Sequence, residues 1–252
     1  MRRLVAISAV LGFLILLSGC SAPPKKLAVE KLTGVNRIAV VSLLGEELEG
    51  KYVGWTAFNN KHWLSEPTDW GLNELSAGVV SRYVTGRGIA VLDMDYPRET
   101  MWERYLSSRE SYKTRVSEAY GNDRTTPLFG TELRAMADEG QLDGFILLVP
   151  GYQGPMCPSG EPCIGYGTRG YGIQNHLKKS QAAYLSIKLY FVSASDLTAK
   201  AQTQANLHGS LSFVDWHPLL REYSETQREE MREAVQAIAE KEIPRALQKM
   251  GI

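Results

Sequence analysis

The sequence predicts an α/β domain with an α+β tendency: a mixed sheet covered by helices, a late antiparallel hairpin and a long C-terminal helix. Short apolar runs rich in β-branched residues recur along the chain, as in buried strands. Segments with apolar residues at helical spacing lie between them, and this alternation is typical of a sheet with helices on its faces. Two later segments alternate apolar and polar residues, which favours antiparallel strands.

The first half of the chain holds most of the expected buried strands. Its elements, in order, are a strand at 37–44, one or two strands within 51–64, a helix at 70–85, a strand at 89–94, helices at 97–120 and 128–140, and a strand at 143–150. The helix at 70–85 ends at Gly86 and Gly88, which stop a helix readily. The helix at 97–120 is highly charged, so one of its faces is expected in water.

The second half begins with a glycine-rich stretch, residues 151–172. The strand expected at 183–192 has an alternating pattern, which predicts one buried and one wetted face. The buried side chains are Leu185, Ile187, Leu189 and Phe191, and the wetted ones are Tyr184, Ser186, Lys188 and Tyr190. Residues 206–214 alternate similarly and complete a hairpin. The helix at 224–250 starts with a capping box, Ser224 and Gln227, and Pro244 is expected to kink it.

The chain divides into three parts. Residues 1–19 have the layout of an export signal: Arg2 and Arg3, then a 14-residue apolar run from Leu4 to Leu17 that is too short to span a membrane. Residues 20–34 contain Pro23 and polar residues and are expected to form a tether. Residues 35–252 are expected to form a single periplasmic domain, a length at which one core suffices.

The junction Leu17-Ser18-Gly19-Cys20 resembles the lipobox of bacterial lipoproteins. The resemblance implies that a diacylglycerol and a further fatty acid, palmitate among them, are attached to Cys20 and that the chain is cleaved before it. Ser21 follows the cysteine, which in the Gram-negative sorting pattern implies the outer membrane, with the protein facing the periplasm. The inner membrane and the cell surface are the alternatives.

Two further cysteines, Cys157 and Cys163, form an even pair within the glycine-rich stretch. Exported proteins meet an oxidising compartment, so a disulfide bond between them is expected. A metal site is the alternative, but the spacing is not that of a zinc pair and the next histidine is His176.

The glycine-rich stretch is the main candidate for a recognition site. Tyrosine and arginine are enriched where proteins bind one another, and the stretch contains Tyr152, Tyr166, Arg169 and Tyr171. A long loop without regular structure is commonly either functional or disordered. The same stretch holds a G-x-G-x-x-G pattern at Gly165, Gly167 and Gly170, but no helix pattern follows it, so no dinucleotide cofactor is expected.

Other candidate residues have structural interpretations beside the functional ones. Asp93 and Asp95 share one face of a strand end, where paired carboxylates either bind a metal or stay solvated. The candidate general bases are His62, His176, His208 and His217. An aromatic cluster could either bind glycan or peptide by stacking or form core, and its members are Tyr52, Trp55, Phe58, His62 and Trp63.

These observations favour a binding or accessory module of the cell envelope over an enzyme, because no serine elbow, zinc-binding motif or unassigned cysteine is present. The order of elements is similar to that of envelope accessory lipoproteins, namely penicillin-binding-protein activators and curli-secretion lipoproteins, and implies a protein partner. Alternatives are a hydrolase of cell-wall or lipid material and a subunit of an oligomeric secretion or assembly complex. The chain has 28 basic and 28 acidic residues, so its net charge predicts no binding to nucleic acid or to anionic headgroups. No cofactor and no metal are predicted.

Overall fold

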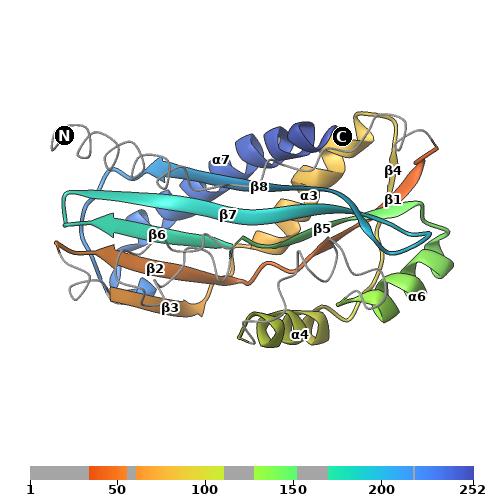
Figure 1. Ribbon diagram of the computed structural model, residues 1–252. Helices are drawn as coiled ribbons and strands as arrows, with labels where there is room; N and C mark the ends of the chain where they lie inside the picture. Colours follow the sequence, from red (N-terminus) through yellow and green to blue (C-terminus); the bar gives the residue numbers. More distant parts are fainter. Residues whose placement is uncertain (1–33, 56–60, 111–127, 152–169, 218) are drawn as a thin grey trace, which may run out of the picture.

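A computed structural model of the chain describes residues 34–55, 61–110, 128–151, 170–217 and 219–252. They form an α+β fold in which one mixed, curled sheet carries helices on both faces, as the sequence predicts (Figure 1). Among these residues, no helix combines the length and the apolar character that crossing a bilayer requires.

The strands are β1 (Arg37–Ser42), β2 (Glu47–Val53), β3 (Lys61–Pro67), β4 (Ala90–Leu92), β5 (Gly144–Pro150), β6 (Tyr171–His176), β7 (Ser180–Ser193) and β8 (Ala199–Ser210). The helices are α3 (Leu72–Thr85), α4 (Arg98–Glu110), α6 (Gly130–Gly140), α7 (Glu225–Met250) and the short 3-10 helix η2 (Leu220–Glu222). The expected order of elements is confirmed, with residues 51–64 contributing to two strands. Strand β6 was missed, because its sequence begins inside the glycine-rich stretch and is too short and polar to predict a strand.

The sheet forks at its longest strand, β7. One edge of β7 pairs with β8 along nearly its whole length. On the other edge, the first half of β7 pairs antiparallel with β6 and the second half pairs antiparallel with β5. Beyond β6 lie β2 and then β3, and beyond β5 lie β1 and then β4, so the strands fan into two branches (Figure 1). β1 runs parallel to both of its neighbours.

Two apolar cores lie on opposite faces of this sheet. One contains side chains of α3 and α7 against the odd-numbered residues of β7, including Leu185 and Leu189. The other contains Met101 and Tyr105 of α4 and Leu133 of α6 against residues of β1 and β5. The helical stripes read from the sequence therefore face the sheet as expected. Pro244 lies inside α7, which continues to Met250, and the predicted capping box at Ser224 and Gln227 is present.

The prediction that the even-numbered face of β7 is wetted is wrong for three of its four residues. Tyr184, Ser186 and Tyr190 are buried, and only Lys188 is partly exposed. Tyr190 is buried because it joins the core under α4 and α6. Tyr184 is also buried: its ring lies over Gly172 and its hydroxyl donates to the buried Glu49 carboxylate. Alternation along one strand identifies two faces, but only the elements packed on them decide which face is dry.

Candidate functional site

Two residues of the glycine-rich stretch, Gly151 and Gly170, both form hydrogen bonds with Ser186, at the point where the sheet divides. The Gly151 N–H donates to the Ser186 carbonyl over 2.7 Å, and the Ser186 N–H donates to the Gly170 carbonyl over 2.8 Å. The two residues that flank segment 152–169, Gly151 and Gly170, are therefore both held beside Ser186. The segment's residues Tyr152, Cys157, Cys163, Tyr166 and Arg169, with the G-x-G-x-x-G glycines Gly165 and Gly167, lie outside the described residues.

Glycine is required at both of these attachment points. A Cβ on Gly151 would lie 2.7 Å from the Ser186 hydroxyl oxygen, closer than real contacts allow. Gly170 has φ +96°, a conformation that glycine adopts without strain, and a Cβ there would lie 3.0 Å from Leu44. Gly151 and Gly170, which in the sequence look like part of a flexible loop, thus allow close packing against Ser186 and Leu44.

Tyr171 does not belong to the recognition surface that the sequence predicts. It is the first residue of β6, is fully buried, and its hydroxyl contacts that of Ser76 in α3. Burial raises the pKa of the Tyr171 phenol above its usual range. The side chain faces the core under α3 because the odd-numbered residues of β6 share that face of the sheet.

A row of polar side chains crosses the opposite face of the sheet. Glu49 of β2, Gly172 of β6, Tyr184 of β7 and His208 of β8 lie side by side in register. The Tyr184 hydroxyl donates to the Glu49 carboxylate over 3.0 Å, and both residues are no more than 1% exposed. The Tyr184 ring passes over Gly172, where a Cβ would lie 2.2 Å from its Cζ. The glycine therefore provides the space that lets phenol and carboxylate meet.

Burial lowers the pKa values of two bases on this face of the sheet, His208 and Lys51. The His208 and Tyr184 ring centroids are 6.0 Å apart, and burial lowers the pKa of the His208 imidazole. Burial also lowers the pKa of the Lys51 amine, while Glu49 opposes that shift. Gln174 is the register neighbour of Lys51, and within the described residues its side-chain oxygen is buried without a hydrogen-bond partner. The row joins a buried acid, a phenol and an imidazole, and the Lys51 amine lies two residues along β2 on the same face of the sheet.

Sequence reasoning singled out His208 but missed Glu49 and Lys51, which lie on the same face of the sheet. The signal that could have found them is the alternation of Glu47, Glu49 and Lys51 before the expected strand, which places charged side chains at every second position of β2. The approach of Glu49 to Tyr184 could not be predicted from the sequence, because it depends on strand register between residues 135 positions apart.

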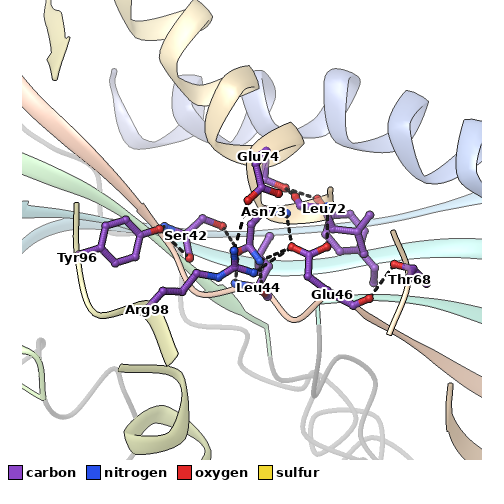
Figure 2. Close-up of polar contacts among 11 residues, drawn as sticks. Ser42, Leu44, Glu46, Thr68, Leu72, Asn73, Glu74, Tyr96 and Arg98 are labelled. Atoms are coloured by element: carbon purple, nitrogen blue, oxygen red, sulfur yellow. Dashed lines mark hydrogen bonds and ion pairs between the residues drawn. The ribbon is translucent and has the colours of Figure 1, made fainter. Parts of the chain in front are cut away.

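A second polar network lies at the carboxyl end of β1 (Figure 2). Glu46 accepts from the backbone N–H groups of Leu72 (2.9 Å) and Asn73 (3.2 Å) at the start of α3. It thereby replaces a capping side chain, because the N-cap residue of α3 is Gly71. Arg98, at the start of α4, pairs with Glu46 over 2.9 Å.

Asn73 completes this network. Its side-chain oxygen accepts from the Ser42 hydroxyl over 2.8 Å and from the Leu44 N–H over 3.0 Å, and its amide nitrogen donates to Glu46 over 2.6 Å. These contacts join the β1–β2 connection to both helices, so the network is a structural joint.

The other candidate residues whose side chains are described form no metal site. Asp93 and Asp95 are exposed beyond β4, and no three metal-ligating side chains gather among the described residues. The His217 ring packs edge-on against the Tyr223 ring, with 4.7 Å between the ring centroids. The His217 backbone N–H donates to the Tyr223 hydroxyl, as in a structural turn. The side chains of His62 and His176 lie outside the description.

The predicted aromatic cluster is divided between core and surface. Tyr52 packs against Trp216 with 5.6 Å between ring centroids and is partly buried. Trp55 is 80% exposed. Phe58 and the side chain of Trp63 lie outside the description.

A shallow cavity of about 400 Å³ lies where the tether meets the domain, lined in part by Gly34, Arg134 and Asp143. Its polar groups are engaged locally: Arg134 donates to the Ala194 carbonyl, and Asp143 accepts from the N–H groups of Asn36 and Arg37. The Asp143 carboxylate therefore holds Asn36 and Arg37, near the start of β1, beside this cavity.

No protein-family model matches the chain. No curated protein matches its sequence. Solved structures with similarity include a PelC dodecamer from Paraburkholderia phytofirmans (TM-score 0.34, 7% identity, 86% of this chain and 88% of that one). Two others are protein XCC0632 from Xanthomonas campestris (0.38, 10%, 92% and 84%) and lipoprotein GNA1162 from Neisseria meningitidis (0.27, 8%, 79% and 94%). One of these is named as a lipoprotein, the class that the sequence resembles, but at TM-scores below 0.5 neither family nor function is carried over.

Proposed function

We propose that this chain is a bacterial lipoprotein, anchored to the outer membrane through Cys20, whose periplasmic domain is a binding or accessory module for a protein of the cell envelope. The anchor is supported by the export signal and by Leu17-Ser18-Gly19-Cys20. The buried clusters of the described residues are built from residues 38–252.

The observation that carries the binding role is the attachment of both ends of segment 152–169 at Ser186. A rigid sheet holds the two ends at one place, which lowers the entropic cost of presenting the side chains between them. Tyr152, Tyr166 and Arg169 are the proposed recognition residues, and a Cys157–Cys163 disulfide is proposed to brace them. Tyr171 is excluded from this set because it is core.

The anchor is tested by labelling cells with an alkyne-bearing palmitate. We expect the wild-type chain to carry the label and to fractionate with the outer membrane, and Cys20→Ala to lose both properties. The double variant Cys157→Ala/Cys163→Ala is the matched control, because it removes two thiols and keeps Cys20. Equal labelling of the Cys20→Ala variant would refute the anchor.

The binding role is tested by crosslinking in cells, followed by purification and mass spectrometry. We expect one dominant envelope protein with the wild type, and its loss in the variant Tyr152→Ala/Tyr166→Ala/Arg169→Ala. The control variant Asp93→Asn/Asp95→Asn changes exposed residues beyond β4 and should retain the partner. Retention of the same partner by both variants would contradict the proposed recognition segment.

A further inference from the structure

One end of the sheet carries the exposed large apolar side chains of the described residues. Trp55 is 80% exposed and Val214 is 41% exposed. Trp55 follows β2, and Val214 is held at the same end, because its carbonyl accepts from the Asn175 amide over 2.9 Å and Asn175 is the register neighbour of Tyr52. This is the end at which the arrowheads of β2 and β6 lie, at the left of Figure 1.

Two lysines share this end. Lys178 and Lys179 form the turn between β6 and β7 and are both exposed. Leu177 and Lys178 have φ +57° and +55°, as in the tight turns that join hairpin strands. The Lys179 ammonium lies 5.3 Å from the centre of the Trp55 ring. We call Trp55, Lys178, Lys179 and Val214 the Trp55 end.

We propose that the Trp55 end contacts the anionic surface of a phospholipid bilayer. Tryptophan favours the membrane–water interface because its ring is apolar and its N–H is polar, and lysines beside it attract phosphate headgroups. The chain as a whole has equal numbers of basic and acidic residues, so this local pair of lysines does not show in its net charge. One acidic residue, Asp215, is exposed next to Val214 at the same end, where its carboxylate accepts from the Gln227 amide. A stable protein interface requires a broader apolar centre than two separate side chains provide.

The geometry lets the domain reach the membrane that anchors it, an argument that rests on the proposed lipid at Cys20. Across β5, the start of β1 is level with the last residues of β7, and across β6, the end of β2 is level with the first residues of β7. Gly34 and Trp55 therefore lie at opposite ends of the sheet. β7 has 14 residues, and a strand of that length spans about 43 Å. The tether, residues 21–34, extends to about 48 Å when fully stretched. The stretched tether is therefore long enough for the Trp55 end to lie against the bilayer while the lipid stays inserted.

Depth-dependent fluorescence quenching tests this contact without requiring the lipid. The mature chain with Cys20→Ser and an N-terminal hexahistidine is held through its tether on vesicles that contain a nickel-chelating lipid. The vesicles are phosphatidylcholine with or without phosphatidylglycerol, and their acyl chains carry bromine. The probe is the difference in tryptophan quenching between the wild type and Trp55→Phe.

We expect bromolipid quenching in phosphatidylglycerol vesicles that is largely lost in Trp55→Phe. Lys178→Asn/Lys179→Gln should weaken the contact about fivefold for each lysine removed, and high salt should do the same. Lys241→Gln/Lys249→Gln on α7 is the matched control, because it removes two exposed lysines far from Trp55 and should leave quenching unchanged.

Equal quenching of wild type and Trp55→Phe would overturn the proposal. So would loss of an envelope protein crosslinked in cells when Trp55 is replaced, without any quenching difference, because the surface would then bind protein. Failure of the Cys20 labelling would refute the anchor alone, since these vesicles hold the chain by its histidine tag.

Discussion

Replacing Gly172 by alanine tests the polar row directly. A Cβ at this position would lie 2.2 Å from Tyr184 Cζ, 2.3 Å from the Tyr184 hydroxyl and 2.4 Å from the Glu49 carbonyl oxygen. The ring and the β2 backbone would both have to move, and the buried Glu49 carboxylate would lose its phenol donor. Overpacking and the lost charged hydrogen bond each cost about 1–3 kcal/mol, so we expect a destabilisation of about 4 kcal/mol.

The assay is equilibrium urea unfolding of the mature chain with Cys20→Ser. Gly78→Ala is the matched control, because Gly78 lies in helix α3 and its added Cβ would have an ordinary 3.5 Å contact with Arg82. It should stabilise the domain by about 1 kcal/mol through helix propensity. Stability of Gly172→Ala within about 0.5 kcal/mol of the wild type would refute the close approach of Tyr184 and Glu49.

A double-mutant cycle isolates the clash with the ring. Tyr184→Ala alone should be strongly destabilising, by about 3–5 kcal/mol for a large buried aromatic residue. In the Gly172→Ala background its cost should be smaller, because the ring that clashes with the new Cβ is gone. The relief is expected to be partial, since the Glu49 carbonyl remains 2.4 Å from that Cβ. Strict additivity would show that residues 172 and 184 do not touch.

Three further predictions concern caps and pH. Glu46→Ala should lower the free energy of unfolding in urea by about 2 kcal/mol, because α3 loses its cap and Arg98 loses its nearer partner. Glu74→Ala, with 71% of its side chain exposed, should lower it by under about 0.5 kcal/mol. Equal costs would contradict the structural role of the Glu46 network. The pKa of His208 is lowered in the fold, so the unfolded chain takes up the proton first and stability should fall as the pH drops below about 6.5. That decline should be weaker in His208→Gln, and an NMR titration that places the pKa above 6.5 would contradict it. Ser224→Ala should cost about 1 kcal/mol and Ser224→Gly only a few tenths, measured by thermal unfolding; identical stabilities would argue against the capping box.

Most secondary structure could be read from the sequence because it depends on neighbours along the chain. The continuous apolar run of β5 indicates a strand buried on both faces, and the spacing of Met231 and Val235 indicates the buried face of α7. Strand β6 escaped because Tyr171 and Ile173 contribute only two apolar side chains among glycine and amides, and its partners β2 and β7 are what make it a strand.

The candidate sites divide in the same way. The export signal, the lipid-attachment motif at Cys20 and the cysteine pair are local patterns, and they stand as predictions from the sequence alone. The burial of Tyr171, the exposure of Trp55 and the meeting of Glu49 with Tyr184 depend on which strands lie side by side.

The sequence by itself determined the anchor motif, the order of the strands and helices apart from β6, and the buried stripes of the helices. Only the tertiary structure decided that β7 forks the sheet, that Ser186 holds both Gly151 and Gly170, and that polar residues of β2, β7 and β8 share one row across Gly172 of β6. The physical reason is that periodicity records a residue's exposure within its own element, whereas strand register and helix placement arise from packing between segments far apart in the chain.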